Sequence, residues 1–204
     1  KLPSVGVSNA DLSTVYRIGD GTLSPLEGPM VEEAWHRALD ESVITREGKN
    51  YAWTIPLSLP LTDSEAKSLS SGGSATIRNE EGESVAIVDS ASIFEWDKPK
   101  YVRSVYGTER LDHPGGRAVE ADSRSMLLGG QMRTLPQPIH PEYGQFMFAP
   151  SVTRALIRDR KWTRALAFQT RNPLHRAHEY ALVAGIETLT AKGEFAGAVL
   201  NPLV

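Results

Sequence analysis

The side chains best suited to chemistry are concentrated in one stretch, from Gln169 to Glu179. Among its side chains are two amides, a guanidinium and two imidazoles, at Gln169, Asn172, Arg171, His175 and His178. A guanidinium presents a rigid fork of donors that matches a tetrahedral oxyanion, and amides donate hydrogen bonds without adding charge. This combination predicts an anion site that suits phosphate or sulfate better than a carboxylate.

The elements around this stretch predict where the anion site lies in the fold. Residues 164–168 are typical of a short buried strand, residues 175–191 of a helix packed on a sheet, and residues 196–200 of a second strand. Strand, helix and strand in this order predict a parallel α/β unit with a right-handed crossover. Ligands bind such units beyond the carboxyl ends of the strands, beside helix N-termini with unpaired N–H groups. Pro173 disfavours helical backbone at Asn172 and so keeps the connecting loop extended.

The paired histidines favour transition-state stabilisation over metal binding. His175 and His178 are three residues apart, so they share a face in a first helical turn. A zinc site needs a third ligand and usually the H-E-x-x-H spacing, which is absent, so we expect no protein-bound metal. Two surface histidines without a function are the alternative, and the neighbouring arginine and amides argue against it. The imidazoles therefore fit donors to phosphoryl oxygens.

Two further chemistries were considered at the same stretch. Thr170 could act as a nucleophile only beside a general base, so a hydrogen bond to substrate or to the loop is the favoured role. The sequence contains no G-x-x-x-x-G-K-[ST] motif, which excludes a P-loop mechanism within these residues.

The composition is that of an ordinary globular protein. The 204 residues allow one large domain or two small ones. With 22 basic and 25 acidic residues the formal net charge is −3, which argues against nonspecific nucleic-acid binding. The absence of cysteine excludes disulfides and thiolate chemistry and fits a reducing, cytoplasmic compartment. No apolar run approaches the roughly 20 residues of a membrane helix, so no membrane partner is expected.

The chain before residue 138 predicts a β-rich domain with a few helices. In residues 1–30 only residues 11–18 are expected to be ordered, and residues 98–117 are expected to be irregular. Expected strands lie at residues 53–59, 74–78, 84–88, 92–96 and 126–130, and expected helices at residues 31–39 and 62–69. The prolines in residues 53–59 place that strand on an edge or break it. Asp112 and His113 could be a metal pair, but a capped turn before Pro114 is favoured because adjacent ligands do not make a metal site.

The second part of the chain begins after a proline-rich segment. Residues 134–150 contain four prolines and read as an extended linker, and Ser151 is expected to cap a helix over residues 152–159. The expected domains are therefore residues 1–137, with a barrel-like sheet, and residues 138–204, with an α/β fold. The chain begins at Lys1 and ends in an apolar, strand-like run, which indicates that both ends are cut.

The stretch Gln169–His178 resembles the ATP sulfurylase (sulfate adenylyltransferase) family, whose motif Q-x-R-N-P-x-H-x-x-H it matches at every fixed position. Weaker similarities cover much of the remaining chain. Leu23–Gly28 resembles F-S-P-L-x-G with leucine for phenylalanine, Ile55–Leu57 resembles an I-P-I strand, and Leu128–Gly130 also recurs in the family. Tyr106–Gly115 resembles a G-T-x-D-x-x-H-P-G turn in which Asp112 is shifted.

The resemblance implies a fold and a reaction. The fold is α+β, with an N-terminal PUA-like β-barrel domain followed by the start of a Rossmann-like nucleotidyltransferase domain. Sulfate would attack the α-phosphorus of ATP to give adenylyl sulfate and diphosphate, in sulfate assimilation or in reverse, with Mg²⁺ carried on the nucleotide. The resemblance also implies a homo-oligomeric enzyme that binds neither nucleic acid nor membrane.

By motif position, Gln169 and Arg171 would bind sulfate. The ATP site would comprise Gln169, Thr170, Arg171, Asn172, His175 and His178, of which the last five are the catalytic group. The two histidines would stabilise the pentavalent phosphorus and the departing diphosphate. A later G-R-D-H-A-G-type motif of the family is absent, and Asn201 stands where histidine is usual, so the 204 residues are expected to carry half a site and to be inactive alone. Another α/β adenylyltransferase with the same paired histidines, or a non-catalytic RNA-binding module, remain alternatives.

Overall fold

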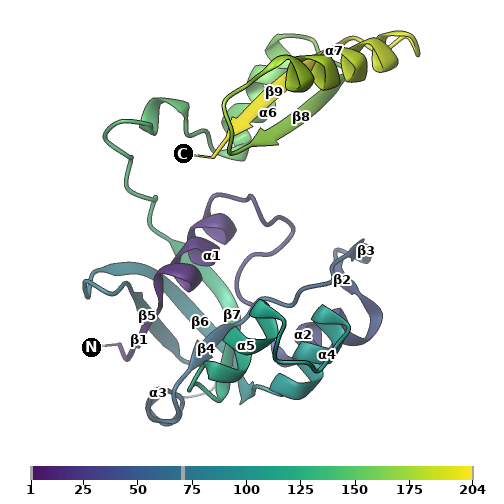
Figure 1. Cartoon of the computed structure of the whole chain (residues 1–204). Helices are drawn as coiled ribbons and strands as arrows, with labels where there is room; N and C mark the ends of the chain where they lie inside the picture. Colours follow the sequence, from purple (N-terminus) through teal and green to yellow (C-terminus); the bar gives the residue numbers. More distant parts are fainter. Residues whose placement is uncertain (1, 70–71, 204) are drawn as a thin grey trace. The chain divides into compact units, whose positions relative to one another are not determined.

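The computed structural model describes residues 2–69 and 72–203, which form two compact units, residues 1–144 and 145–204 (Figure 1). The strands of the first unit are β1 (Ser4–Gly6), β2 (Val43–Arg46), β3 (Lys49–Ala52), β4 (Leu59–Leu61), β5 (Ser74–Arg78), β6 (Ser84–Glu95) and β7 (Met126–Thr134). Its helices are α1 (Asn9–Gly19), α2 (Glu32–Glu41), α3 (Asp63–Ser68), α4 (Lys98–Tyr106), α5 (Pro114–Ala121) and the 3₁₀ turn η1 (Gly144–Phe146), which reaches into the second unit. Within the described ranges, no helix has the length and apolar character needed to cross a membrane.

The first unit is built on a five-stranded mixed sheet with the order β1-β5-β6-β7-β4. The β1–β5 pair is parallel and the other pairs are antiparallel. Among the described residues the hydrogen bonding leaves β1 and β4 as edges, so the sheet is open where a barrel was expected. The expected strand over residues 53–59 is broken, and only Leu59–Leu61 pairs with β7. Pro60 is tolerated there because β4 is an edge strand.

Several sequence-based expectations for this unit were wrong. Residues 92–96 are not a separate strand, because β6 continues to Glu95 through a register shift between Ser90 and Ser92. Residues 98–117 are not irregular but contain α4, which is capped by the Asp97 side chain, and the first half of α5. The favoured capped turn at His113 is confirmed, since its Nδ1 accepts hydrogen bonds from the N–H groups of Gly115 and Gly116 at 3.2 and 3.4 Å. Strand β1 and the full length of β7 were also not predicted.

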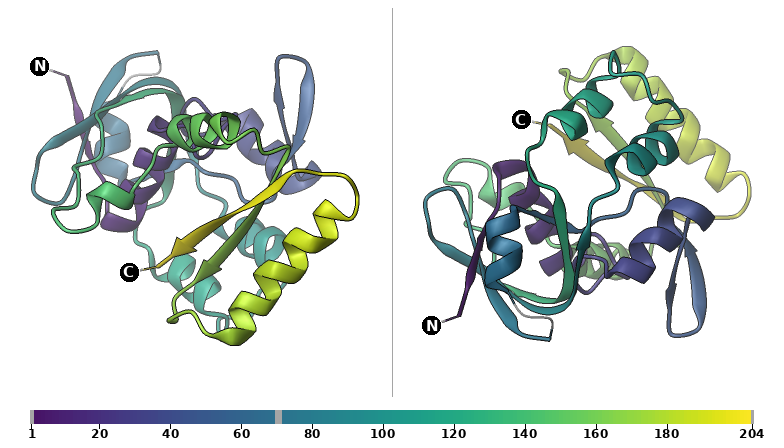
Figure 2. Two further views of the ribbon diagram at one scale, coloured as in Figure 1. Left: turned by 90° about the horizontal axis from the view of Figure 1, so that it is seen from above. Right: turned by 90° about the horizontal axis from the view of Figure 1, so that it is seen from below.

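The β2–β3 hairpin is a second element that the sequence reading missed. Its two-residue turn has positive φ at both positions, 51° at Glu47 and 74° at Gly48. Positive φ at both central residues is the geometry of a type I′ turn, which matches the twist of the flanking strands. The hairpin is not part of the five-stranded sheet and projects from the rest of the first unit (Figure 2).

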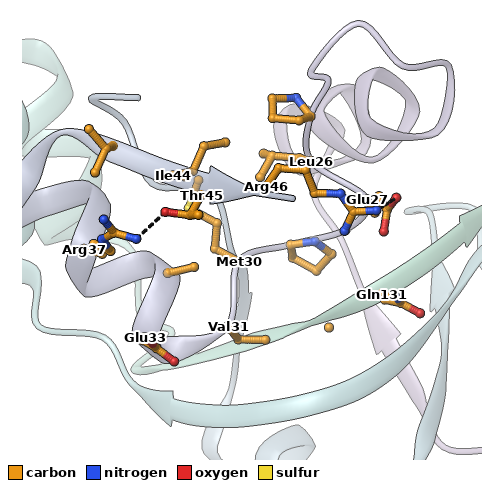
Figure 3. Close-up of a pocket in the computed structure, with 16 residues that line it drawn as sticks. Leu26, Glu27, Met30, Val31, Glu33, Arg37, Ile44, Thr45, Arg46 and Gln131 are labelled. Atoms are coloured by element: carbon orange, nitrogen blue, oxygen red, sulfur yellow. Dashed lines mark hydrogen bonds and ion pairs between the residues drawn. The ribbon is translucent and has the colours of Figure 1, made fainter. Parts of the chain in front are cut away.

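The segment Leu23–Gly28 packs directly against Leu128–Gly130 of β7. Gly130 N–H donates to Pro29 O at 2.9 Å, and Met132 N–H donates to Glu27 O at 3.0 Å, so the segment after residue 24 lies along β7 (Figure 3). A Cβ on Gly28 would lie 1.9 Å from Gly130 O, and a Cβ on Gly129 would lie 2.2 Å from Met30 O. Glycine is required at both positions because backbone meets backbone.

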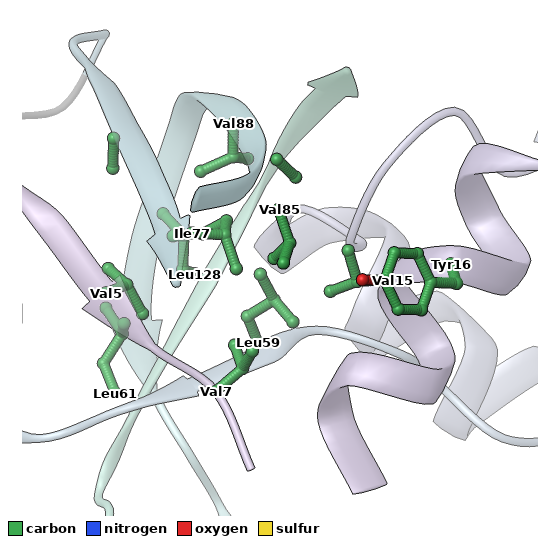
Figure 4. Packing of buried hydrophobic residues seen from close by; sticks show 12 residues of the cluster. Val5, Val7, Val15, Tyr16, Leu59, Leu61, Ile77, Val85, Val88 and Leu128 are labelled. Atoms are coloured by element: carbon green, nitrogen blue, oxygen red, sulfur yellow. The ribbon is translucent and has the colours of Figure 1, made fainter. Parts of the chain in front are cut away.

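The core of the first unit consists of two apolar clusters. One lies between the sheet and α1 and is centred on Val5, Val15, Leu59, Ile77 and Leu128 (Figure 4). The other surrounds Trp35, which is 1% exposed, and includes Leu39, Ile44, Phe94 and Leu127. The prediction that Trp35 is a core residue is confirmed.

The second unit contains α6 (Pro150–Asp159), β8 (Arg164–Thr170), α7 (Arg176–Thr190) and β9 (Ala196–Pro202). Strands β8 and β9 are parallel, as predicted. The capping role of Ser151 was wrong, because α6 begins two residues earlier than expected, with Pro150 as its first residue and Ala149 as the N-cap. Proline suits the first helical position because an N–H group there has no acceptor within the helix, so its absence costs no hydrogen bond.

Candidate active site

The predicted anion site lies where β8 ends and α7 begins. Strand β8 runs two residues further than expected, because Gln169 and Thr170 pair with Asn201 and Pro202 of β9. The N–H of Leu203 donates to Thr170 O at 2.9 Å and extends this pairing by one bond. The connecting loop is therefore residues 171–175, and its first residue follows directly from a fixed strand.

The alternation of β8 separates two of the predicted site residues. Leu166, Phe168 and Thr170 are half-buried, whereas the intervening residues and Gln169 are exposed. Helix α7 packs on the Leu166 side, since a Cβ on Gly185 would lie 2.7 Å from Leu166 Cδ2. Because successive side chains of a strand point to opposite faces, Thr170 faces α7 and Gln169 faces away from it.

Thr170 holds the loop through its hydroxyl group. Its Oγ1 accepts a hydrogen bond from the N–H of Asn172 at 3.0 Å and donates one to the carbonyl oxygen of Asn172 at 3.1 Å. These bonds form a local turn at the strand end. Within the described ranges both hydrogen bonds found for this hydroxyl go to Asn172 and none to a side-chain base, so the geometry matches the loop-bonding role and not a nucleophile.

His175 is the N-cap of α7, one position before the expected first turn. Its Nδ1 accepts a hydrogen bond from the N–H of Ala177 at 3.3 Å. An Nδ1 that accepts a hydrogen bond carries no proton, so the neutral ring has its proton on Nε2. The exposed Nε2–H is then a donor toward any ligand at the helix N-terminus.

His178 lies against His175, and the ring centroids are 3.9 Å apart at an interplanar angle of 28°. The Phe168 ring centroid lies 5.3 Å from that of His178. The Nδ1 of His178 is buried without a hydrogen-bond partner among the described residues, so Nε2 is the nitrogen that can reach a ligand. Phe168 was predicted only as part of a buried strand, and its position two residues before Thr170 is the signal that places it on the α7 face.

The two remaining predicted residues are exposed and available to a ligand. Arg171 and Asn172 lie in the loop, and in residues 2–69 and 72–203 Arg171 forms no ion pair. The only such pair found there within the second unit joins Arg164 and Glu194, at the opposite end of β8. An exposed guanidinium without a carboxylate partner, beside the positive end of a helix, is suited to an anion.

The same donors do not suit a magnesium ion. Mg²⁺ prefers oxygen ligands, mostly carboxylates and water, whereas this site presents guanidinium, imidazole and backbone N–H groups. Among the described residues no group of three or more histidine or acidic side chains is placed to hold a metal.

Comparison with known proteins finds a family match for each of the two units. A family described as PUA-like domain matches residues 1–137, and one described as ATP-sulfurylase matches residues 144–204. The sulfate adenylyltransferases of Pyropia yezoensis and Staphylothermus marinus are 45% and 36% identical to the whole chain, which covers 49% and 50% of their lengths. The chain thus spans about half the length of these curated relatives.

A solved structure described as a hexameric APS kinase from Thiobacillus denitrificans has a similar fold. Its TM-score is 0.72 at 22% identity, over 99% of this chain and 34% of that one. The family matches and the relatives agree with the motif that β8 and α7 present. The chain thus carries a domain of the PUA-like family in residues 1–137 and ATP-sulfurylase family sequence in residues 144–204.

Proposed function

We propose that the protein of which this chain forms part is a sulfate adenylyltransferase, which converts ATP and sulfate to adenylyl sulfate and diphosphate. The observation that carries the proposal is the paired-histidine motif at the β8–α7 junction, where the stacked imidazoles lie 3.9 Å apart beside an exposed Arg171. Relatives named sulfate adenylyltransferase support the same assignment. Residues 1–137 form the PUA-like domain and residues 138–204 the first part of a Rossmann-like catalytic domain.

In the proposed reaction a sulfate oxygen attacks the α-phosphorus of ATP. A new S–O–P linkage forms, and the bond to the β-phosphate oxygen breaks with its electron pair leaving on diphosphate. Negative charge accumulates on the oxygens around phosphorus, so donors held in place before the reaction stabilise the transition state most. No protein nucleophile is needed.

The exposed side chains divide into two groups. Gln169, on the face of β8 that points away from α7, and Arg171, in the loop that follows β8, bind sulfate. The Nε2 groups of His175 and His178, with the N-terminus of α7, contact the phosphoryl oxygens. Thr170 and Asn172 form the turn between the two groups, where both substrates meet. Magnesium enters with ATP as part of the substrate.

The assignment of the acceptor is tested with a sulfate analogue. A protein of the relatives' full length should consume ATP and release diphosphate when molybdate is added, because an oxyanion of sulfate's shape enters the same site and its mixed anhydride hydrolyses. Sulfate should compete with molybdate for the site and so lower the molybdate-dependent release of AMP. ATP consumption that is indifferent to both oxyanions would point to another adenylyl acceptor. We further propose a homo-oligomeric, cytoplasmic enzyme; sedimentation of the full-length protein tests the oligomeric state.

A further inference from the structure

The first unit contains a pocket of about 390 Å³ that is remote in sequence from the β8–α7 junction. Two uninterrupted runs of residues line it, Pro25–Val31 and Val43–Arg46, with side chains of α2 and β7 at its ends (Figure 3). Its volume falls within the range of about 300–1,000 Å³ that is typical of ligand sites. The second of these runs is strand β2.

The lining shows that the pocket lies along the edge of β2. Successive side chains of a strand point to opposite faces, so a pocket on one face would touch only alternate residues. All four residues of Val43–Arg46 line this pocket. The ligand space is therefore beside the strand, in the direction of its backbone hydrogen bonds.

The backbone groups on that edge are unpaired. Trp53 N–H donates to Ser42 O at 2.7 Å, and the register of the hairpin then makes Ile44–Tyr51 and Arg46–Lys49 its other hydrogen-bonded pairs. The N–H and C=O groups of Val43 and Thr45 must point away from β3. In the part of the chain that the structure describes, these groups make no hydrogen bond. The free groups of Val43 and Thr45 are two residues apart, which is the spacing at which an added strand forms its hydrogen bonds.

The opposite wall offers matching groups. Glu27 and Pro29 direct their carbonyl oxygens to β7, whereas neither the N–H nor the C=O of Gly28 is bonded within residues 2–69 and 72–203. Leu26, Val31 and Val43 supply partly exposed apolar side chains to the lining, whereas Met30 and Ile44 are buried beneath it. The pocket thus combines free backbone donors and acceptors with an apolar surface, which is what an extended peptide requires.

The charges around the pocket select one kind of peptide. Arg46 pairs with Glu27, and Arg37 pairs with Glu41 and also contacts Thr45 (Figure 3). Glu33 is exposed and has no ion-pair partner among the described residues. The pocket therefore carries an uncompensated negative charge at the Glu33 end.

We propose that this pocket, the slot between β2 and Pro25–Val31, binds an extended peptide segment of another protein, which adds as a strand to the free edge of β2. The peptide carries apolar side chains at alternate positions and a basic residue at the end near Glu33. Edge strands with free backbone groups are templates for such addition, and among residues 2–69 and 72–203 no other strand pairs with β2 on this side. The proposal does not depend on the catalytic role of the second unit.

The test uses the whole 204-residue chain and a capped hexapeptide that begins with lysine and then alternates valine and threonine. Saturable binding with a Kd below about 1 mM should slow amide exchange at Val43 and Thr45 and leave Ile44 unchanged. Two peptides N-methylated on the odd or the even residues test the edge without altering the protein. One of the two should lose binding at least tenfold, because only one set of N–H groups faces β2.

A matched pair of proline variants tests the location. Thr45→Pro removes an N–H that points into the slot, whereas Asn50→Pro removes the N–H of its cross-strand partner, which points away. Both variants lose the same Thr45–Asn50 side-chain hydrogen bond of 2.7 Å, so only Thr45→Pro should abolish peptide binding. Glu33→Gln should weaken binding of the lysine peptide by about 1.5- to 5-fold.

Three results would overturn the proposal. The first is that the peptide binds the two proline variants equally well, and the second is that both N-methylated peptides bind equally well. The third is that no peptide binds, while the parent chain forms a dimer that Thr45→Pro dissociates. The last would assign the edge to a second copy of the chain.

Discussion

Replacing Gly28 by alanine should unfold the first unit at a markedly lower temperature without touching the candidate active site. The backbone of Gly28 does not need positive φ, so alanine is permitted locally and the effect comes from packing alone. Its Cβ would lie 1.9 Å from Gly130 O, 2.9 Å from Met132 N and 3.0 Å from Gln131 Cα. All three neighbours are backbone atoms, so no side chain can rotate away.

The expected loss follows from what has to move. Separation by about 1 Å is needed to reach a 3.0 Å contact, and it would break the hydrogen bonds from Gly130 N and Met132 N to residues 29 and 27. Two such bonds contribute about 1 kcal/mol each, and overpacking adds about 1–3 kcal/mol. A total of about 3–5 kcal/mol corresponds to a Tm lower by about 10 °C.

Tryptophan fluorescence during thermal unfolding is a suitable assay, because three of the four tryptophans, Trp35, Trp53 and Trp96, belong to the first unit. Gly6→Ala is the matched control, since a Cβ there meets only Glu65 Oε1 at 4.0 Å; its Tm should stay within about 2 °C of the parent. A Gly28→Ala protein with an unchanged Tm would refute the packing of the two glycine motifs.

Two more predictions concern hydrogen bonds. Burial opposes ionisation of Asp122, but hydrogen bonds from Arg124 outweigh it and hold the pKa of this carboxyl below its ordinary value. Its stabilising contribution is therefore present above about pH 4 and is lost as the pH falls further. Asp122→Asn should lower the free energy of unfolding by about 1–2 kcal/mol at pH 7 and make that free energy, measured by urea unfolding, less dependent on pH in the acid range. An unchanged pH dependence in the acid range would contradict this. Thr170→Val should lower kcat in the full-length enzyme by about tenfold, whereas Thr170→Ser keeps both hydroxyl bonds to Asn172 and should lower it by less than threefold. Equal losses in the two variants would show that the hydroxyl does not hold the loop.

Local patterns predicted much of the fold correctly. Capping by Thr62, the β5–β6 hairpin and the strand–helix–strand order of the second unit depend on neighbours in sequence, and they were found as expected. Errors arose where long-range contacts decide. Strand β1, for example, pairs with β5 about 70 residues away. The helices in residues 98–117 are a different case, because their signals are local: Asp97 caps α4 and His113 caps α5 despite a polar composition.

The candidate site was predictable in its residue types but not in its geometry. The motif supplied the candidate donors Gln169, Arg171, Asn172, His175 and His178. Sequence alone could not place Gln169 and Thr170 on opposite faces, because that depends on β8 continuing to pair with β9 through residue 170. Nor could it give the stacking of the two imidazoles, which requires His175 to be the cap and His178 to lie in the first turn.

The most direct test of the proposed function is sulfate-dependent formation of adenylyl sulfate by a protein of full length carrying Arg171→Ala. Removing the guanidinium should lower kcat/KM for sulfate by about 10²–10³-fold with an unchanged Tm, because Arg171 is exposed and unpaired in the described residues. Arg164→Ala is the control at the other end of β8, where only the exposed ion pair with Glu194 is lost, and it should keep near-parental activity. Near-parental sulfate turnover in Arg171→Ala would contradict the assignment of this loop as the sulfate site.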